Sequence, residues 1–316
     1  MKRILIKCYY EFKPFIPRYI QVLVRQHFAQ AKRASLKDSW PIDKSTGKKP
    51  EHWFGWPKGK KFALVLTHDV ESVVGQEKCR ELMQIEKERD FLSSFNFVPE
   101  RYDVSKTLRD FLTDQGYEVG VHDLKHDGKL YKSRHSFLRK AEKINRYLKE
   151  WNAVGFRSGA MHHNLDWIHA LNVQYDASTF DADPFEPQPD GIGTIFPSWI
   201  GRDGTGEGYV EMPYTLPQDF TLFVLLKEKN IDIWQRKLDW IVEQGGMVLL
   251  NTHPDYMNFG GKNERYDSYP VDYYIKFLDH IRTAYKDHYW NVLPKDLAGY
   301  FTDRFHNRTS LSHHED

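Results

Sequence analysis

Two histidines four residues apart, His122 and His126, follow an apolar segment that ends at Val121. Imidazole nitrogens at this spacing can lie on one side of a turn and bind a divalent metal ion as a pair. The pair carries little weight alone, because a chain with 15 His also contains such spacings as solvated loop residues. Its interpretation therefore depends on the residues that accompany it.

Three other apolar segments also end in polar side chains of the types that occur in active sites. Asp69, Arg157 and His253 each stand at the end of such a segment or directly after it. Because the carboxyl ends of parallel strands meet at one mouth of an α/β barrel, these four strand ends predict a single site. Side chains alternate along a strand, so we expect Asp69 to face the barrel interior and His68 to face away from it.

The elements that must position these residues alternate between strand and helix patterns. Short, nearly continuous apolar runs are typical of strands that are covered on both faces, and the charged stretches between them are typical of covering helices. Strands are predicted at 62–67, 94–99, 117–121, 153–156, 173–176, 247–251 and 290–293. Helices are predicted at 76–92, 105–114, 134–151, 164–171, 231–244 and 269–285. This alternation predicts an α/β fold, either a βα barrel or a doubly wound sheet.

A segment rich in Pro and Gly, 180–218, interrupts this rhythm. We expect it to form an elaborated loop near the mouth, where binding segments tend to lie, with a strand at 210–213. Asp181 and Asp183 within it are expected to be turn residues.

The composition limits the class of protein. A formal net charge of +1 argues against a nucleic-acid binder that relies on bulk electrostatics. The only cysteines, Cys8 and Cys79, provide no disulfide framework, which fits a reducing compartment. The N-terminus lacks a signal-peptide pattern and no apolar stretch is long enough to span a membrane, so we expect a cytoplasmic protein.

Charge is nevertheless uneven along the chain. Residues 1–50 contain 12 Lys and Arg against three acids, and the remainder contains 33 against 41. A helix is predicted over 17–33, with Ile20, Leu23 and Val24 on one stripe and its basic residues off that stripe. Such a helix can lie on the anionic inner face of a membrane or hold a polyanion, or it can be strapped across the barrel with its charges in water.

Three regions are predicted from these patterns. Residues 1–60 are expected to form a basic extension with a helix and an aromatic connector, residues 61–303 the barrel, and residues 304–316 a frayed polar tail.

The motifs together resemble the polysaccharide deacetylase family, carbohydrate esterase family 4, whose members contain the NodB homology domain. In chain order the matching pieces are THDVE at 67–71, HDLKH at 122–126, RSGA at 157–160, YDAST at 175–179 and LLNTHP at 249–254. The order and spacing of the five pieces agree with the family, over roughly residues 61–300. The resemblance implies a distorted (β/α) barrel of about seven strands.

The resemblance also implies a divalent metal, most often zinc, with cobalt, manganese and nickel as alternatives. His122 and His126 match the two histidine ligands of the family. Val70 stands where the family has a metal-binding Asp, and Val cannot be a ligand. We therefore expect Glu71 to be the third ligand and Asp69 the general base, with Asp69 as the alternative ligand.

Five further residues receive roles from the same resemblance. Arg157 would hold Asp69 ionised, and protonated His253 would donate to the departing amine. Asp176 would orient His253, or would be purely structural. The wall of the site is altered, since RSGA lacks the Pro and Tyr of the family motif, so we expect the backbone N–H of Ala160 to bind the oxyanion and His162 to contact substrate.

The implied activity is hydrolysis of a carbon–nitrogen bond, with removal of an N-acetyl group from an amino sugar of a glycan or a saccharide precursor. One alternative is hydrolysis of a non-sugar C–N bond, as in allantoinase-like relatives. A second alternative, from a different class, is a non-catalytic glycan-binding protein that kept the barrel. Val70 in place of the family's Asp, together with the altered RSGA, favours the non-catalytic alternative. The presence of Asp69, Arg157 and His253 favours the enzyme.

Overall fold

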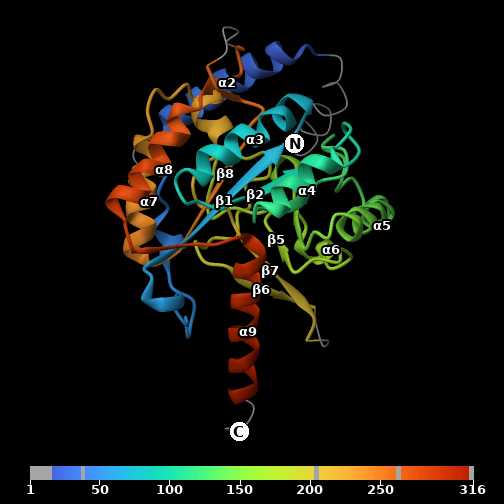
Figure 1. Cartoon of the computed structure of the whole chain (residues 1–316), viewed down its shortest axis with the longest axis vertical. Helices are drawn as coiled ribbons and strands as arrows, with labels where there is room; N and C mark the ends of the chain where they lie inside the picture. Colours follow the sequence, from blue (N-terminus) through green and yellow to red (C-terminus); the bar gives the residue numbers. More distant parts are fainter. Residues whose placement is uncertain (1–15, 37–39, 203–205, 261–264, 313–316) are drawn as a thin grey trace.

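The centre of the structure, a computed structural model, is one nine-stranded sheet that curls into a distorted barrel with helices on its outside (Figure 1). The residues described are 16–36, 40–202, 206–260 and 265–312. The strands of the sheet are β1 (Phe62–Val70), β2 (Ser94–Phe97), β3 (Glu118–His122), β4 (Gly155–Arg157), β5 (Tyr175–Asp176), β6 (Ser198–Gly201), β7 (Gly208–Glu211), β8 (Met247–Thr252) and β11 (Tyr289–Asn291). Their order is β11-β1-β2-β3-β4-β5-β7-β6, and β8 also pairs with β1.

The barrel is built around β1, whose nine residues are all buried. One edge of β1 pairs in parallel with β11 and then with β2, and the other edge pairs in parallel with β8. On the far edge of β8, irregular chain closes the barrel, because Thr215 N donates to Leu249 O at 3.0 Å and Leu249 N donates to Thr215 Oγ1 at 3.0 Å. This irregular closure is the distortion of the barrel.

Both faces of β1 are covered, which explains its apolar sequence. Leu64 and Leu66 belong to the core between the sheet and the helices, whereas Ala63 and Val65 belong to a second core with residues of β5, β7 and β8. The same alternation places Thr67 and Asp69 on the side of the second core. The apolar interior of the barrel therefore ends in polar side chains at the mouth.

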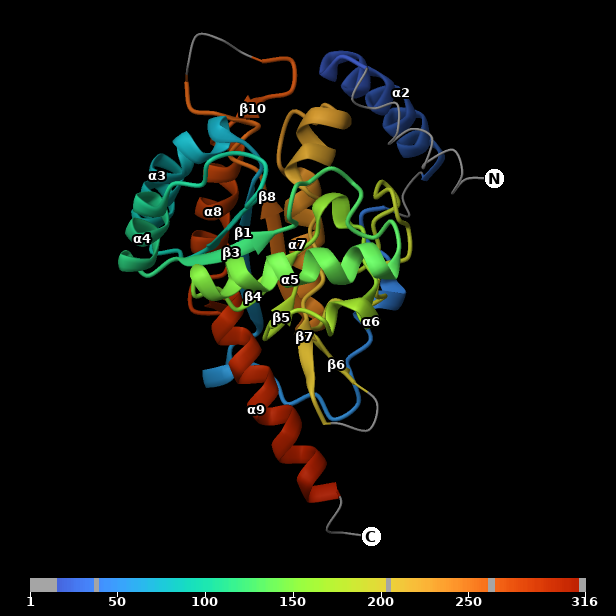
Figure 2. The same cartoon turned by 90° about the vertical axis from the view of Figure 1, so that its right-hand side faces the viewer.

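Helices surround the sheet, as the turned view in Figure 2 also shows. They are α2 (Arg18–Leu36), α3 (Val73–Lys87), α4 (Lys106–Asp114), α5 (Arg134–Glu150), α6 (Leu165–Ile168), α7 (Asp232–Gln244), α8 (Asp272–Ala284) and α9 (Pro294–Ser312). A π-helix, η5 (Phe220–Leu225), and two short strands, β9 (Met257–Asn258) and β10 (Tyr269–Pro270), complete the mouth. In both views α2 lies at one end of the molecule and α9 projects from the other (Figures 1 and 2).

The fold class predicted from the sequence is confirmed, and three details differ. The segment 180–218 contains β6, which pairs antiparallel with β7 and was not predicted. The π-helix η5 was not predicted either. The frayed tail predicted after residue 303 is wrong up to residue 312, because α9 continues there, and its Phe305 ring stacks on Trp199 with centroids 5.5 Å apart.

Candidate active site

The candidate site is a cleft where β1, β3, β4 and β8 end, with α2 and η5 on its rim. Its walls combine the acids and histidines predicted from the sequence with two arginines and aromatic residues from the rim. The lining residues used below are Arg18, Arg25, Asp69, Glu71, His122, His126, Ala160, Phe220, His253 and Tyr256.

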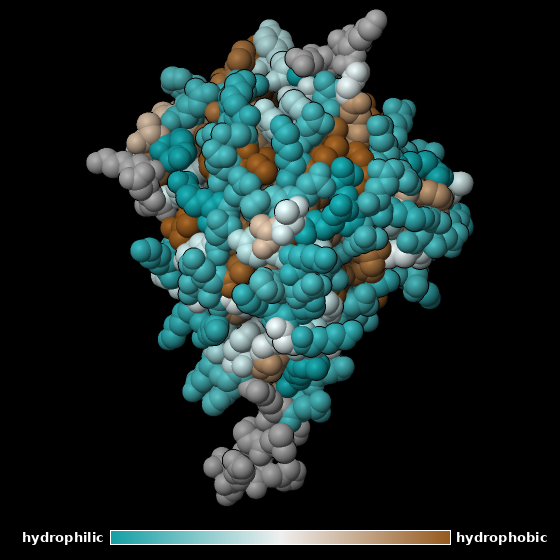
Figure 3. Space-filling view, turned by 60° about the vertical axis from the view of Figure 1, so that its left-hand side comes forward, coloured by the Kyte–Doolittle hydropathy of each residue, from teal (hydrophilic) through white to brown (hydrophobic). Residues whose placement is uncertain are grey.

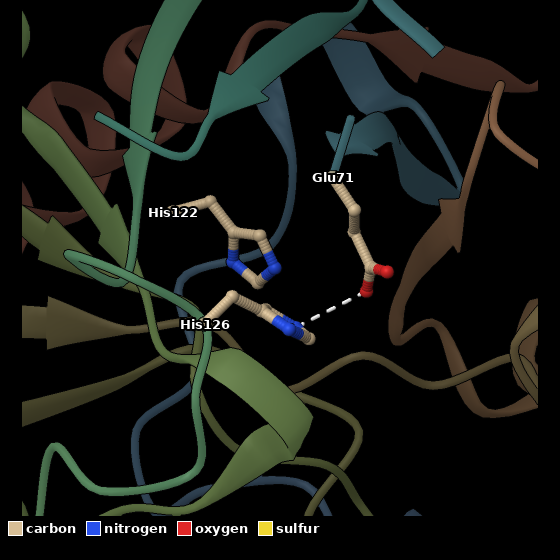
Figure 4. Close-up of side chains that lie close together, drawn as sticks. All are labelled: Glu71, His122 and His126. Atoms are coloured by element: carbon tan, nitrogen blue, oxygen red, sulfur yellow. Dashed lines mark ion pairs between the residues drawn. The ribbon is translucent and has the colours of Figure 1, made fainter. Parts of the chain in front are cut away.

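One carboxylate and two imidazoles form a cluster suited to a metal ion (Figure 4). Glu71, His122 and His126 each offer one ligand atom, and these atoms lie within 4.8 Å of one another. In Figure 4 the two rings approach from one side and the carboxylate from the other. Two nitrogens and one oxygen are a donor set that divalent zinc accepts.

The protonation of His122 fits the role of a ligand. Its Nδ1 lies 3.1 Å from the carbonyl oxygen of Arg157, which can only accept, so Nδ1 carries the proton and Nε2 keeps its lone pair. Nε2 is buried without a hydrogen-bond partner among the described residues. A cation bound at this position would satisfy the buried nitrogen and the neighbouring carboxylate together.

Glu71 links the cluster to the rim. Its Oε1 lies 3.1 Å from His126 Nε2, and its Oε2 accepts from the Tyr256 hydroxyl at 3.1 Å. Burial raises the pKa of Glu71, but the interaction with His126 outweighs burial and holds that pKa well below its ordinary value. Arg101 Nη1 lies 2.9 Å from His126 Nδ1, which therefore accepts, so Nε2 carries the proton in this arrangement and would bind a cation only in the other tautomer.

Asp69 is held by amide and guanidinium groups on both carboxylate oxygens. Asn251 Nδ2 donates to Oδ2 at 2.8 Å, and Asn96 Nδ2 and Arg157 Nη1 donate to Oδ1 at 3.1 and 3.3 Å. Burial raises the pKa of Asp69, but the protonated form of His122 and the charge of Arg157 outweigh burial and lower that pKa below its ordinary value. Its Oδ2 lies 3.8 Å from His122 Nε2, so Asp69 is adjacent to the cluster and remains an ionised acceptor.

Arg157 is buried at the centre of this network. Its Nη1 also donates to Thr67 Oγ1 at 2.8 Å and to Asn251 Oδ1 at 2.5 Å, and its Nε donates to the Ala177 carbonyl at 2.8 Å. A planar guanidinium with several fixed donors orients acceptors on neighbouring strands more rigidly than an ammonium would.

The partner of His253 differs from the one predicted. His253 Nδ1 lies 2.7 Å from Asp219 Oδ1, and His253 N donates to Asp219 Oδ2 at 2.8 Å. Burial lowers the pKa of His253, but the charge and hydrogen bond of Asp219 outweigh burial and raise it to about 10. His253 is thus held protonated, with Nε2 4.0 Å from Glu71 Oε1.

Asp176 does not orient His253, which corrects the prediction. Its Oδ1 accepts from Ser178 Oγ at 2.6 Å, and the register of β5 and β7 makes Glu211 its neighbour. Burial raises the pKa of Asp176. Asp176 is the last residue of β5 and lies beside Glu211 of β7, so it belongs to the wall of the barrel, whereas Asp219 is the partner of His253.

The backbone near the histidine pair is unusual. Asp123, His126, Ala160 and Met161 have φ angles of 55°, 53°, 55° and 52°, in the left-handed region that L-residues rarely adopt. The Gly159 N–H donates to Asp123 Oδ2 at 3.2 Å and so ties the two loops together. Strain of this kind is typical of functional sites.

The two residues predicted at the oxyanion and substrate positions are separated by the structure. Ala160 lines the cleft. His162 is not among the lining residues, and its carbonyl accepts from Ser158 Oγ. Met161, which follows Ala160 and also has a left-handed backbone, still lines the cleft, and the chain leaves the lining at His162.

Sequence reasoning missed three residues of the site. Asp219 directly precedes the apolar run of η5, to which no element was assigned, and no motif marked this acid. Arg18 and Arg25 reach the cleft from α2, where Arg18 Nη2 donates to the Tyr256 hydroxyl at 3.0 Å. Their basic character was visible, but their direction depends on tertiary packing.

Comparison with known proteins places the fold. No family model and no curated protein matches the chain. Among solved structures, a protein assigned as a polysaccharide deacetylase from Mycobacterium smegmatis has a TM-score of 0.61 at 17% identity, over 80% of this chain and 94% of that one. The Puue allantoinase has a TM-score of 0.61 at 15% identity, over 83% and 97%.

A second protein assigned as a polysaccharide deacetylase, from Pseudomonas aeruginosa PAO1, has a TM-score of 0.60 at 14% identity, over 83% of this chain and 98% of that one. Within the described part of the chain, no helix is both long enough and apolar enough to cross a bilayer. The matches cover nearly the whole of each neighbour, so the chain has the polysaccharide deacetylase fold, the NodB-like barrel that the sequence resemblance predicted.

Proposed function

We propose that this protein is a metal-dependent hydrolase that removes an N-acetyl group from an amino sugar of a glycan or a saccharide precursor. The observation that carries the proposal is the cluster of Glu71, His122 and His126 beside Asp69 and His253, with ligand atoms within 4.8 Å of one another. A resident metal-binding cluster, an ionised acceptor and a protonated donor are the groups that amide hydrolysis requires.

Each group then has a chemical task. A divalent cation on the three ligands would polarise the acyl oxygen and acidify a water molecule. Asp69 accepts a proton from the attacking water, and Arg157 keeps Asp69 oriented. The new C–O bond forms as the carbonyl becomes an oxyanion, which the backbone N–H of Ala160 can stabilise. When the C–N bond breaks, His253 gives its proton to the nitrogen, and the products are acetate and a free amine.

Metal analysis is the first test. The purified full-length protein should bind about one ion per chain. Glu71→Ala and His122→Ala should lose the ion, whereas the matched control His163→Ala should keep it, since His163 lies outside the cluster and contacts the Met161 and Asp190 carbonyls. Retention in Glu71→Ala alone would move the third ligand to Asp69. Parent protein that stays empty after incubation with zinc, cobalt or manganese would contradict the proposal, and glycan binding that resists a chelator would then favour the non-catalytic alternative.

A second candidate is hydrolysis of a non-sugar C–N bond. The likeness to the Puue allantoinase, at a TM-score of 0.61, favours this candidate on the fold alone. N-acetylated saccharides and allantoin should therefore be offered to the same metal-loaded enzyme. Release of acetate from a saccharide supports the first candidate, and turnover of allantoin alone supports the second.

A further inference from the structure

Helix α2 turns its charged side chains toward the protein. Arg18 donates to Tyr256, as described above, and the Arg25 guanidinium lies over the Phe220 ring, 4.8 Å from its centroid. The residue after Arg25 contacts the same element, since Gln26 Nε2 donates to the Val224 carbonyl at 2.8 Å. These contacts anchor α2 on η5 and on the rim of the cleft.

The C-terminal half of α2 behaves in the same way. Lys32 Nζ donates to the Pro184 carbonyl, and the Arg33 guanidinium lies 5.0 Å from the centroid of the Trp40 ring. All four basic residues of the helix therefore contact the body of the protein, through hydrogen bonds or cation–π contacts.

The opposite face of α2 is apolar and exposed. Tyr19, Ile20, Leu23, Val24 and Phe28 expose 52%, 36%, 58%, 47% and 69% of their surface. Their spacing of three, four and five residues places them on one side of a helix. They are five of the ten large hydrophobic residues that the described chain exposes.

This arrangement reverses the usual one. A helix on a water-soluble surface buries its apolar stripe and exposes its charges, and a contiguous exposed apolar patch marks an interaction site. In Figure 3 the surface is largely hydrophilic, and the brown hydrophobic atoms gather mainly in its upper half, the end at which α2 lies in Figure 1. A partner is therefore needed to cover the outer face of α2.

The charge of the sequence that leads into and forms α2 favours an anionic partner. Residues 1–33 contain eight Lys and Arg against one acid, Glu11. Near the rim, Lys227 and Lys229 are exposed beside Tyr266, which itself exposes 47% of its surface. Aromatic and basic residues around an apolar stripe are typical of a helix that lies in the interface of an anionic bilayer.

We propose that the outer face of α2 docks the protein onto an anionic lipid bilayer, with Leu23, Val24 and Phe28 among the acyl chains. A second copy of the chain fits this face less well, because a symmetric pair would bring two strongly basic N-terminal regions together. Since the inner face of the same helix borders the cleft, a docked molecule holds the rim of the cleft close to the lipid surface.

The test is co-sedimentation of the full chain with vesicles. Vesicles of phosphatidylcholine with phosphatidylglycerol should bind the protein, and vesicles of phosphatidylcholine alone should bind it more weakly. The double variant Leu23→Asp, Phe28→Asp should lower the affinity for the anionic vesicles by about 10-fold or more. The reason is that two apolar side chains that enter the bilayer on docking become charged. The double variant Leu92→Asp, Leu138→Asp, which changes two exposed residues elsewhere, should bind like the parent.

Three outcomes overturn the proposal. These are no binding of the parent to anionic vesicles, equal binding of the α2 variant, and a dimer in light scattering that the α2 variant abolishes, which would make a second copy the occupant. Thermal unfolding and metal content of each variant are measured in parallel. Loss of vesicle binding with the metal retained separates this proposal from the proposed function.

Discussion

Two buried histidines of this protein are each paired with a carboxylate, yet only one faces the cleft. His68 Nε2 lies 2.8 Å from Glu86 Oε1, and His253 Nδ1 lies 2.7 Å from Asp219 Oδ1. The first stands on β1 and the second directly follows β8, which is paired with β1. The two pairs therefore have the same chemistry on neighbouring strands.

They differ in what the second nitrogen does. His68 Nδ1 is engaged with Thr252 Oγ1 at 2.7 Å, and its ring packs between Phe95 and Tyr274. His253 lines the cleft and directs Nε2 toward the Glu71 carboxylate. A carboxylate partner therefore does not by itself identify a functional histidine. The property that distinguishes His253 from His68 is a second ring nitrogen that remains available to a ligand in the cleft.

The largest expected effect is on turnover and concerns Asp219. Asp219→Asn keeps the shape of the side chain but removes the charge that holds His253 protonated, so kcat should fall by ~10² to 10⁴. The matched control is Asp176→Asn, which changes an acid that does not contact His253 and should keep most of the activity. Steady-state kinetics on the metal-loaded proteins would measure both, and an equal loss in the two variants would contradict the assignment.

The second expected effect is on stability and concerns the other pair. His68→Ala leaves Glu86 buried without its imidazole partner, which should lower the free energy of unfolding by ~3 to 5 kcal/mol. Turnover per folded molecule should change far less than in Asp219→Asn. Denaturant unfolding beside active-site titration would measure both quantities, and a normal stability with lost turnover would make His68 a functional residue.

The smallest effects come from one hydrogen bond on each side of the comparison. Thr252→Val removes the hydroxyl beside His68, and Tyr269→Phe removes the hydroxyl that donates to Asp219 Oδ2 at 2.8 Å. Each variant should lose about 1 kcal/mol of stability. Only Tyr269→Phe should also lower kcat, since it alone changes the environment of His253. Equal kcat values in the two variants would show that the Tyr269 hydroxyl does not affect the role of His253.

Local patterns were sufficient for the fold and for much of the site. The apolar run of β1 predicted a strand covered on both faces, and strand alternation predicted that His68 would face away from the cleft, as its contact with Glu86 confirms. His122 and His126 could be predicted as a pair because both lie at the end of one strand or within a few residues after it. Glu71 was readable from the same strand end as Asp69, and the ligand roles of these residues remain predictions.

Residues that reach the site from irregular chain were not predictable. Asp219 caps a π-helix whose short apolar run, FTLFVL, has neither the helical nor the alternating period and so did not identify the element. Asp176 was assigned to His253 because YDAST matches the Asp-bearing segment of the family, but its strand pairs it with Glu211 instead. For α2 the periodicity was right and the direction was open, since contacts with Tyr256 and Phe220 decide which face turns inward.

The adjacency of His68 and Asp69 has a consequence for strand registration. The two residues are consecutive on β1, so they point to opposite sides of the sheet, one into the layer of helices and one into the cleft. A slip of β1 by one residue would press the Asp69 carboxylate against Phe95 and Tyr274 and would put an imidazole in place of the base. The buried pair of His68 and Glu86 therefore acts as a registration pin that excludes misaligned forms of the barrel before any ligand is bound.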